Sequence, residues 1–131
     1  MAPPEATVAA ALPYPKAEEL AKPNSSLNAG QLNQQGRTLL AEGKYGEAME
    51  VLTRALTLKP DHAQALNARG FSYYMLRKFD PALADLNKAI KLDPTYINAY
   101  HNRSIVLQRL GQTQAAEQDR QTEQRLLQQH R

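Results

Sequence analysis

The chain has 131 residues, a formal net charge of +3 and no cysteine. This length suggests one domain, and the lack of cysteine excludes disulfide bonds and thiolate metal sites. The charge is too small, and the cations are too scattered, to indicate a nucleic-acid-binding protein. No apolar run approaches the roughly 20 residues that a membrane-spanning helix needs.

The first 27 residues differ in composition from the rest. Alanine is frequent there, and five of the eight prolines lie there: Pro3, Pro4, Pro13, Pro15 and Pro23. Prolines at this spacing block a continuous helix, so we expect residues 1–27 to be a disordered tail or linker and 28–131 to be the folded domain. The composition is similar to stretches that follow a removed signal or lipid anchor. We therefore favour an exported or envelope-associated (periplasmic) bacterial protein over a cytoplasmic one.

Residues 28–131 align with themselves when the chain is shifted by 34 positions. Three repeats then cover 29–62, 63–96 and 97–130. Apolar positions such as Leu32 and Leu39 are seven residues apart, which places them on one face of a first helix. A small residue at Gly36 would let the second helix approach closely, with Ala48 as its partner. The equivalent positions include Gly36, Gly70 and Ser104; Ala48, Ala82 and Ala116; Leu39, Tyr73 and Leu107; and Leu58, Leu92 and Leu126.

Residues with strong backbone preferences mark the ends of the predicted helices. Gly43 and Gly111 would end the first helix of their repeats in a left-handed conformation. Arg77 stands at the equivalent place in the second repeat, a departure that we expect to cost little. Asp80 and Pro81 predict the start of a second helix, with Asp80 as the N-cap.

The third repeat becomes polar in its second half. Arg120 and Glu123 replace residues that are leucine and alanine in the first two repeats. Polar residues at these positions suit a helix with no repeat packed beyond it. We expect a long helix from about Thr113 to Gln129 that closes the stack.

This 34-residue helix-turn-helix pattern resembles the tetratricopeptide repeat family, over about 100 residues of the chain. The resemblance implies an all-α fold: a right-handed superhelical stack of three helix-turn-helix units, with six helices and a long polar capping helix at the end. It also implies that the first helix of each repeat lines a concave surface. Such a protein is expected to be an adaptor or scaffold that binds another protein.

The resemblance also indicates which side chains face the concave surface. Asn33, Asn67 and His101 are equivalent positions, and such a polar row could pair with the backbone of an extended peptide. Phe71 and Tyr74 would hold an apolar side chain, and Arg37 could engage a carboxylate. The predicted peptide-binding groove consists of Asn33, Arg37, Asn67, Phe71, Tyr74, Asn98, His101 and Asn102. A further hypothesis places the Leu12–Pro15 stretch in this groove.

One subtype of the family binds chaperone C-termini through a carboxylate clamp. The clamp uses Lys and Asn in the first repeat, Asn in the second, and Lys and Arg in the third. None of the matching positions carries the family's residue: Asn33, Arg37, Ala68, Asn98 and Asn102. We therefore predict a groove for an extended segment of a partner polypeptide, without this clamp.

A second hypothesis is a structural scaffold that self-assembles by head-to-tail stacking of repeats. Its motivation is an apolar edge at the start of the first repeat, at Leu32 and Leu39. Stacking of this kind would make self-association an alternative to a separate protein partner.

We predict no enzyme activity, cofactor or metal. His62, His101 and His130 lack the spacing of metal ligands, and His62 is expected to be solvated beside a turn. Ser104 replaces a packing glycine, so its hydroxyl is expected to be buried and not nucleophilic. No glycine-rich phosphate loop occurs.

Overall fold

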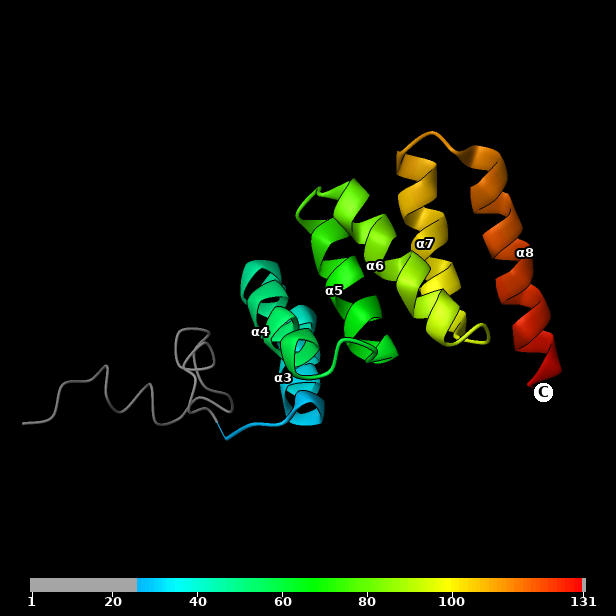
Figure 1. Ribbon diagram of the computed structural model, residues 1–131. Coiled ribbons are helices and arrows are strands. Elements are labelled where there is room, and N and C mark those ends of the chain that lie inside the picture. The colour runs from blue at the N-terminus through cyan, green and yellow to red at the C-terminus, as the bar shows by residue number, and fades with distance from the viewer. Residues whose placement is uncertain (1–25, 131) are drawn as a thin grey trace, which may run out of the picture.

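The computed structural model describes residues 26–130, which form six α-helices and no strand (Figure 1). This confirms the predicted all-α class, and the last helix has the predicted limits. Residues 1–25, with most of the predicted tail and the Leu12–Pro15 stretch, lie outside the described residues. Within 26–130, no helix is long and apolar enough to cross a membrane. The helices are α3 (Ala29–Ala41), α4 (Tyr45–Leu58), α5 (Ala63–Met75), α6 (Phe79–Leu92), α7 (Ile97–Arg109) and α8 (Thr113–Gln129).

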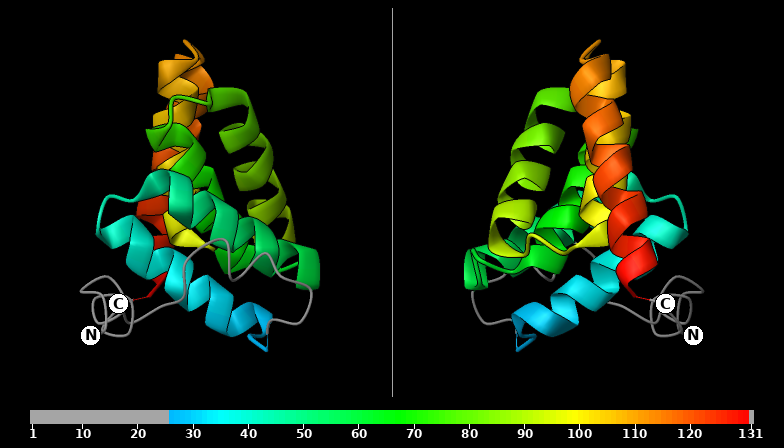
Figure 2. Two further views of the ribbon diagram at one scale, coloured as in Figure 1. Left: turned by 90° about the vertical axis from the view of Figure 1, so that its left-hand side faces the viewer. Right: turned by 90° about the vertical axis from the view of Figure 1, so that its right-hand side faces the viewer.

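Consecutive helices pack into three hairpins, α3–α4, α5–α6 and α7–α8, and each hairpin packs on the next. The first helices also contact one another in order, α3 with α5 and α5 with α7, whereas α4, α6 and α8 make no mutual contact. Figure 2 views the array from its two ends and shows α3 and α8 running in different directions, since successive hairpins are rotated. Therefore α3, α5 and α7 form one continuous face, as the resemblance to the tetratricopeptide repeat family implied.

The apolar core runs through the hairpins along the stack. Leu32, Leu39 and Leu52 are at most 2% exposed and belong to one buried cluster. The prediction that Leu32 and Leu39 form an exposed apolar edge is therefore wrong, because they pack against α4 of their own hairpin. The position of α3 equivalent to the buried Ala65 is Gln31, which is exposed and polar.

Two glycines allow the helices of a hairpin to approach closely. A Cβ added at Gly36 would lie 2.5 Å from Cγ of Leu52, and one at Gly70 would lie 2.9 Å from Cγ of Leu86. The nearest neighbour of each glycine is therefore a leucine one turn beyond the predicted alanine, while a Cβ at Gly70 would also lie 3.2 Å from the carbonyl oxygen of Ala82, the equivalent of Ala48. The prediction that a small residue is needed here is confirmed.

The N-terminal ends of the helices use caps that the sequence pattern indicated only in part. Asn28 caps α3 in a capping box with Gln31. His62 caps α5, because its Nδ1 accepts from the Ala65 N–H at 3.3 Å. His62 is half-buried, and this capping role adds to the expectation of a residue beside a turn. Asp80 is the second residue of α6 and not its N-cap, which is Lys78.

The turn between the two helices of each hairpin has the same conformation three times. Gly43, Arg77 and Gly111 have φ angles of 77°, 62° and 80°. In each turn the following N–H donates to the carbonyl five residues back, at 2.9, 2.8 and 2.9 Å. Arg77 therefore adopts the left-handed conformation that favours glycine. The 34-residue register had placed Arg77 at this position, where the left-handed conformation strains an L-residue.

Candidate functional site

A groove of about 460 Å³ lies across the face formed by α3, α5 and α7. Five of the eight predicted groove residues line it, namely Arg37, Asn67, Phe71, Asn98 and Asn102. The other lining residues are Leu40, Gln64, Ala68 and Tyr96. Gln64 precedes Asn98 by one repeat length, so the 34-residue register could have indicated it.

Asn67 lies at the centre of a hydrogen-bonded network between α5 and α7. Its side chain is buried, its Nδ2 donates to the Tyr96 hydroxyl at 3.3 Å, and its Oδ1 accepts from Asn102 Nδ2 at 3.0 Å. Burial raises the pKa of the Tyr96 phenol, while the hydrogen bond from Asn67 opposes that rise. Both functional groups of the Asn67 amide are therefore engaged within the protein.

Asn33 occupies the equivalent place on α3 and is 4% exposed. Its Nδ2 donates to Gln64 Oε1 at 3.3 Å. Its Oδ1 is buried and has no hydrogen-bond partner among the described residues. Asn33 therefore lies beneath the groove surface and is covered by Gln64.

An exposed cation and an aromatic ring flank this part of the groove. Arg37 lies one turn beyond Asn33 on α3 and is exposed, and Phe71 is half-buried on α5. Tyr74 lies 6.3 Å from Phe71 between ring centroids, and 5.8 Å from Phe79 at the start of α6. Tyr74 packs against the cluster of Ala82, Leu86 and Val106 and is not among the residues that line the groove.

His101 lies outside the groove lining, at a position exposed to solvent. Its Nδ1 is 3.1 Å from a carboxylate oxygen of Glu123 on α8. Among residues 26–130, no group of three or more His, Cys, Asp or Glu side chains could hold a metal ion. Ser104 is buried and donates its hydroxyl hydrogen to the His101 carbonyl at 2.7 Å, as expected for a structural serine.

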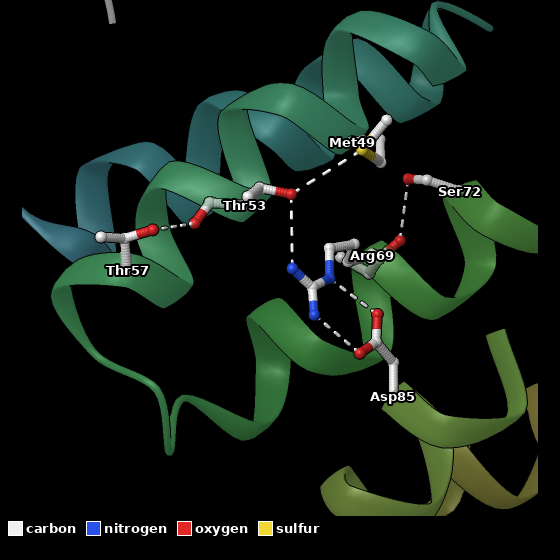
Figure 3. A network of polar contacts seen from close by, with 7 residues as sticks. Met49, Thr53, Thr57, Arg69, Ser72 and Asp85 are labelled. Atoms are coloured by element: carbon white, nitrogen blue, oxygen red, sulfur yellow. Dashed lines mark hydrogen bonds and ion pairs between the residues drawn. The ribbon is translucent and has the colours of Figure 1, made fainter. Parts of the chain in front are cut away.

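A partly buried ion pair, which the apolar repeat pattern did not indicate, links the helices on the side away from the groove. Arg69 donates two hydrogen bonds to Asp85, at 2.7 and 2.8 Å, and a third to the Thr53 hydroxyl at 3.3 Å (Figure 3). The guanidinium therefore joins α4, α5 and α6. The hydrogen bonds to Asp85 raise the pKa of Arg69 against the opposing effect of burial.

The same arrangement recurs one repeat later. Arg103 donates to Asp119 at 2.7 Å twice and to Asn87 Oδ1 at 3.1 Å. All three positions are shifted by 34 residues, so the repeat register held the signal. The first hairpin has Gln35 and Val51 instead, and therefore lacks this ion pair between its helices.

Helical hairpins stacked with a groove across their first helices define a repeat protein with a continuous concave face. The chain belongs to the tetratricopeptide repeat family. Models described as "Tetratricopeptide repeat" match residues 63–96 and 86–118, and one described as "TPR repeat" matches 36–76.

Two curated relatives illustrate the similarity in sequence. RNA polymerase II-associated protein 3 of Mus musculus is 33% identical over 88 residues, which are 67% of this chain and 13% of that protein. Heat shock protein STI1 of Saccharomyces cerevisiae is 32% identical over 94 residues, or 70% of this chain and 16% of that protein. The chain therefore spans less than a fifth of the length of these relatives.

Two solved structures show the similarity in fold. The second TPR of Spaghetti (RPAP3), bound to the HSP90 peptide SRMEEVD, has a TM-score of 0.73 and 30% identity, covering 76% of this chain and 92% of that one. The second TPR domain of human RPAP3, in complex with the HSP70 peptide SGPTIEEVD, has a TM-score of 0.69 and 31% identity, covering 75% and 82%.

Proposed function

We propose that the protein is a non-catalytic interaction module that holds an extended segment of another polypeptide in the groove across α3, α5 and α7. The observation that carries the proposal is the lining of the groove. It combines carboxamides with one exposed cation, Arg37, and a half-buried aromatic ring, Phe71. Carboxamides offer a donor and an acceptor, which suits the N–H and C=O groups of an extended backbone.

Charge indicates which peptides suit this groove. Arg37 is the cation of the lining, and the described lining residues include no Asp or Glu. A carboxylate on the ligand would be attracted to Arg37, and an apolar side chain could pack on Phe71 and Leu40. The favoured ligand is therefore an extended, neutral to mildly acidic segment.

The similar RPAP3 domains support a peptide as the occupant, because they were solved with chaperone peptides. Their peptides end in two glutamates, a valine and an aspartate. At the five clamp positions, this chain has Arg37 as its cation, whereas the clamp pattern has three. We therefore expect SRMEEVD to bind weakly, and Asn98→Lys to raise its affinity several-fold in a salt-dependent way.

The proposal can be tested by panning a random decapeptide library on the immobilised protein and measuring binding of the recovered peptides by calorimetry. Arg37→Glu should lower their affinity about tenfold or more, because it reverses the charge beside the ligand. The matched control is Arg125→Glu, an exposed cation on α8 away from the groove. Failure to recover any peptide, or equal affinities for wild type and Arg37→Glu, would contradict the proposed function.

A further inference from the structure

Asn33 and Asn67 occupy equivalent positions one repeat apart, but their carboxamides have different surroundings. Asn67 uses its donor on Tyr96 and its acceptor on Asn102. Asn33 uses its donor on Gln64, and its Oδ1 has no partner within residues 26–130. A buried carbonyl without a donor is unfavourable, so this atom is a place where a ligand can add a hydrogen bond.

Ala68 explains the difference between the two asparagines. The residue that donates to Asn67 Oδ1 is Asn102, and the position one repeat earlier is Ala68. A methyl group cannot donate a hydrogen bond, and it is also smaller than a carboxamide. Ala68 lines the groove, so the position from which a side chain could donate to Asn33 Oδ1 lies at the groove surface.

The cover over Asn33 is a side chain that can move. Gln64 is exposed, and its side chain accepts one hydrogen bond, from Asn33 Nδ2 at 3.3 Å. A residue in an extended peptide presents its N–H and C=O toward the same side, as it does when paired in a sheet. That pair matches the acceptor and donor of one carboxamide.

We propose that Asn33 binds the backbone of one ligand residue through both of its polar groups, an inference that rests on the proposed function. The ligand displaces Gln64, its C=O accepts from Asn33 Nδ2, and its N–H donates to Asn33 Oδ1. Asn67 is less suited to this backbone pairing, since the nitrogen and the oxygen of its amide each already have a partner within the protein. The ligand residue held at Asn33 has neighbours close to Arg37 and Phe71.

The arrangement has a consequence for specificity. Proline has no backbone N–H, so it cannot supply the donor that Asn33 Oδ1 lacks. An N-methylated residue fails for the same reason. The bound segment should therefore contain one position at which proline and N-methyl residues are rejected, with a carboxylate or an apolar side chain nearby.

The test uses a decapeptide recovered by panning on the wild-type protein, with each backbone N–H replaced in turn by N–CH₃. One position should lose about tenfold in affinity, the effect of one hydrogen bond to a buried acceptor. Ala68→Asn should place a donor on Asn33 Oδ1, as Asn102 does for Asn67. It should weaken the unmodified peptide about tenfold and make the sensitive position insensitive to N-methylation. Ala84→Asn, at an exposed helical position on α6, is the matched control.

The possible outcomes separate this inference from the proposed function. A peptide that binds wild type but has no N-methyl-sensitive position overturns the role of Asn33 and leaves the groove function standing. The same conclusion follows if that position is equally sensitive in Ala68→Asn. If no peptide binds at all, the proposed function itself fails. The N-methyl series on wild type needs no protein variant, so a poorly folded Ala68→Asn protein would not prevent a decision.

Discussion

Replacing Arg77 by glycine should stabilise the protein. Arg77 has a φ of 62°, and the equivalent residues Gly43 and Gly111 have φ of 77° and 80° with the same turn hydrogen bonds. The three turns therefore differ mainly in the side chain they carry. The left-handed conformation costs an L-residue about 1–2 kcal/mol, because Cβ approaches the following carbonyl oxygen.

The net gain is smaller than this steric relief. Glycine loses more backbone entropy on folding, which costs roughly 0.5–1 kcal/mol. The expected stabilisation from Arg77→Gly is therefore about 0.5–1 kcal/mol, or an increase in Tm of about 2–5 °C. Urea unfolding followed by circular dichroism measures the free energy, with calorimetry for Tm.

Two sets of controls separate backbone strain from the loss of the arginine side chain. Arg77→Ala removes the charge but keeps the strain, so it should not stabilise. Gly43→Ala and Gly111→Ala should each destabilise by about 1 kcal/mol, since an added Cβ meets no atom within 4 Å and only the backbone angle changes. An unchanged or lower stability of Arg77→Gly would refute the reasoning.

Three further changes test other parts of the structure. Gly70→Ala should destabilise by about 1–3 kcal/mol through its clash with Leu86, whereas Gly46→Ala, where an added Cβ meets nothing, should be neutral or stabilising. Asp85→Ala should lower the free energy of unfolding by about 3 kcal/mol, because it leaves the partly buried Arg69 without its carboxylate partner. A loss below about 1 kcal/mol in urea unfolding would show that the ion pair contributes little. Burial, followed by the charge of Lys59, lowers the pKa of His62 below its ordinary 6.5. The unfolded chain therefore binds a proton at a higher pH than the folded protein does. The stability of the wild type should fall as pH drops below 6.5 toward the lowered pKa. His62→Asn keeps an N-cap and should reduce this pH dependence, and identical pH profiles for the two proteins would contradict the assignment.

Much of the fold could be predicted because one pattern constrains many positions at once. The 34-residue register fixed the hairpins, the core leucines and the need for small residues at Gly36 and Gly70. Its errors were local. Asp is a residue type that N-caps favour, but α6 begins before Asp80, at Phe79, which packs against the core. The residue type at one position does not show at which residue packing starts the first turn of a helix.

The site was predicted less completely, because helical spacing gives the direction of a side chain but not its partners. Asn33 and Asn67 are the same residue at the same repeat position, and both were predicted to face a ligand. Only the residues one repeat further along, Ala68 and Asn102, decide whether the carboxamide is already engaged. The Arg69–Asp85 pair also recurs at the 34-residue spacing, but a comparison of apolar positions does not include charged residues and so did not predict it.

The uneven distribution of this ion pair has a consequence for hydrogen exchange. The second and third hairpins each have an arginine–aspartate pair between their two helices, and the first has Gln35 and Val51 at those positions. Local opening should therefore require less free energy in α3, and its amides should exchange faster than those of α5 and α7. Asn33 and Arg37 lie on this helix. A ligand held there would slow exchange most in the hairpin that opens most readily, so occupancy of the groove could be followed amide by amide.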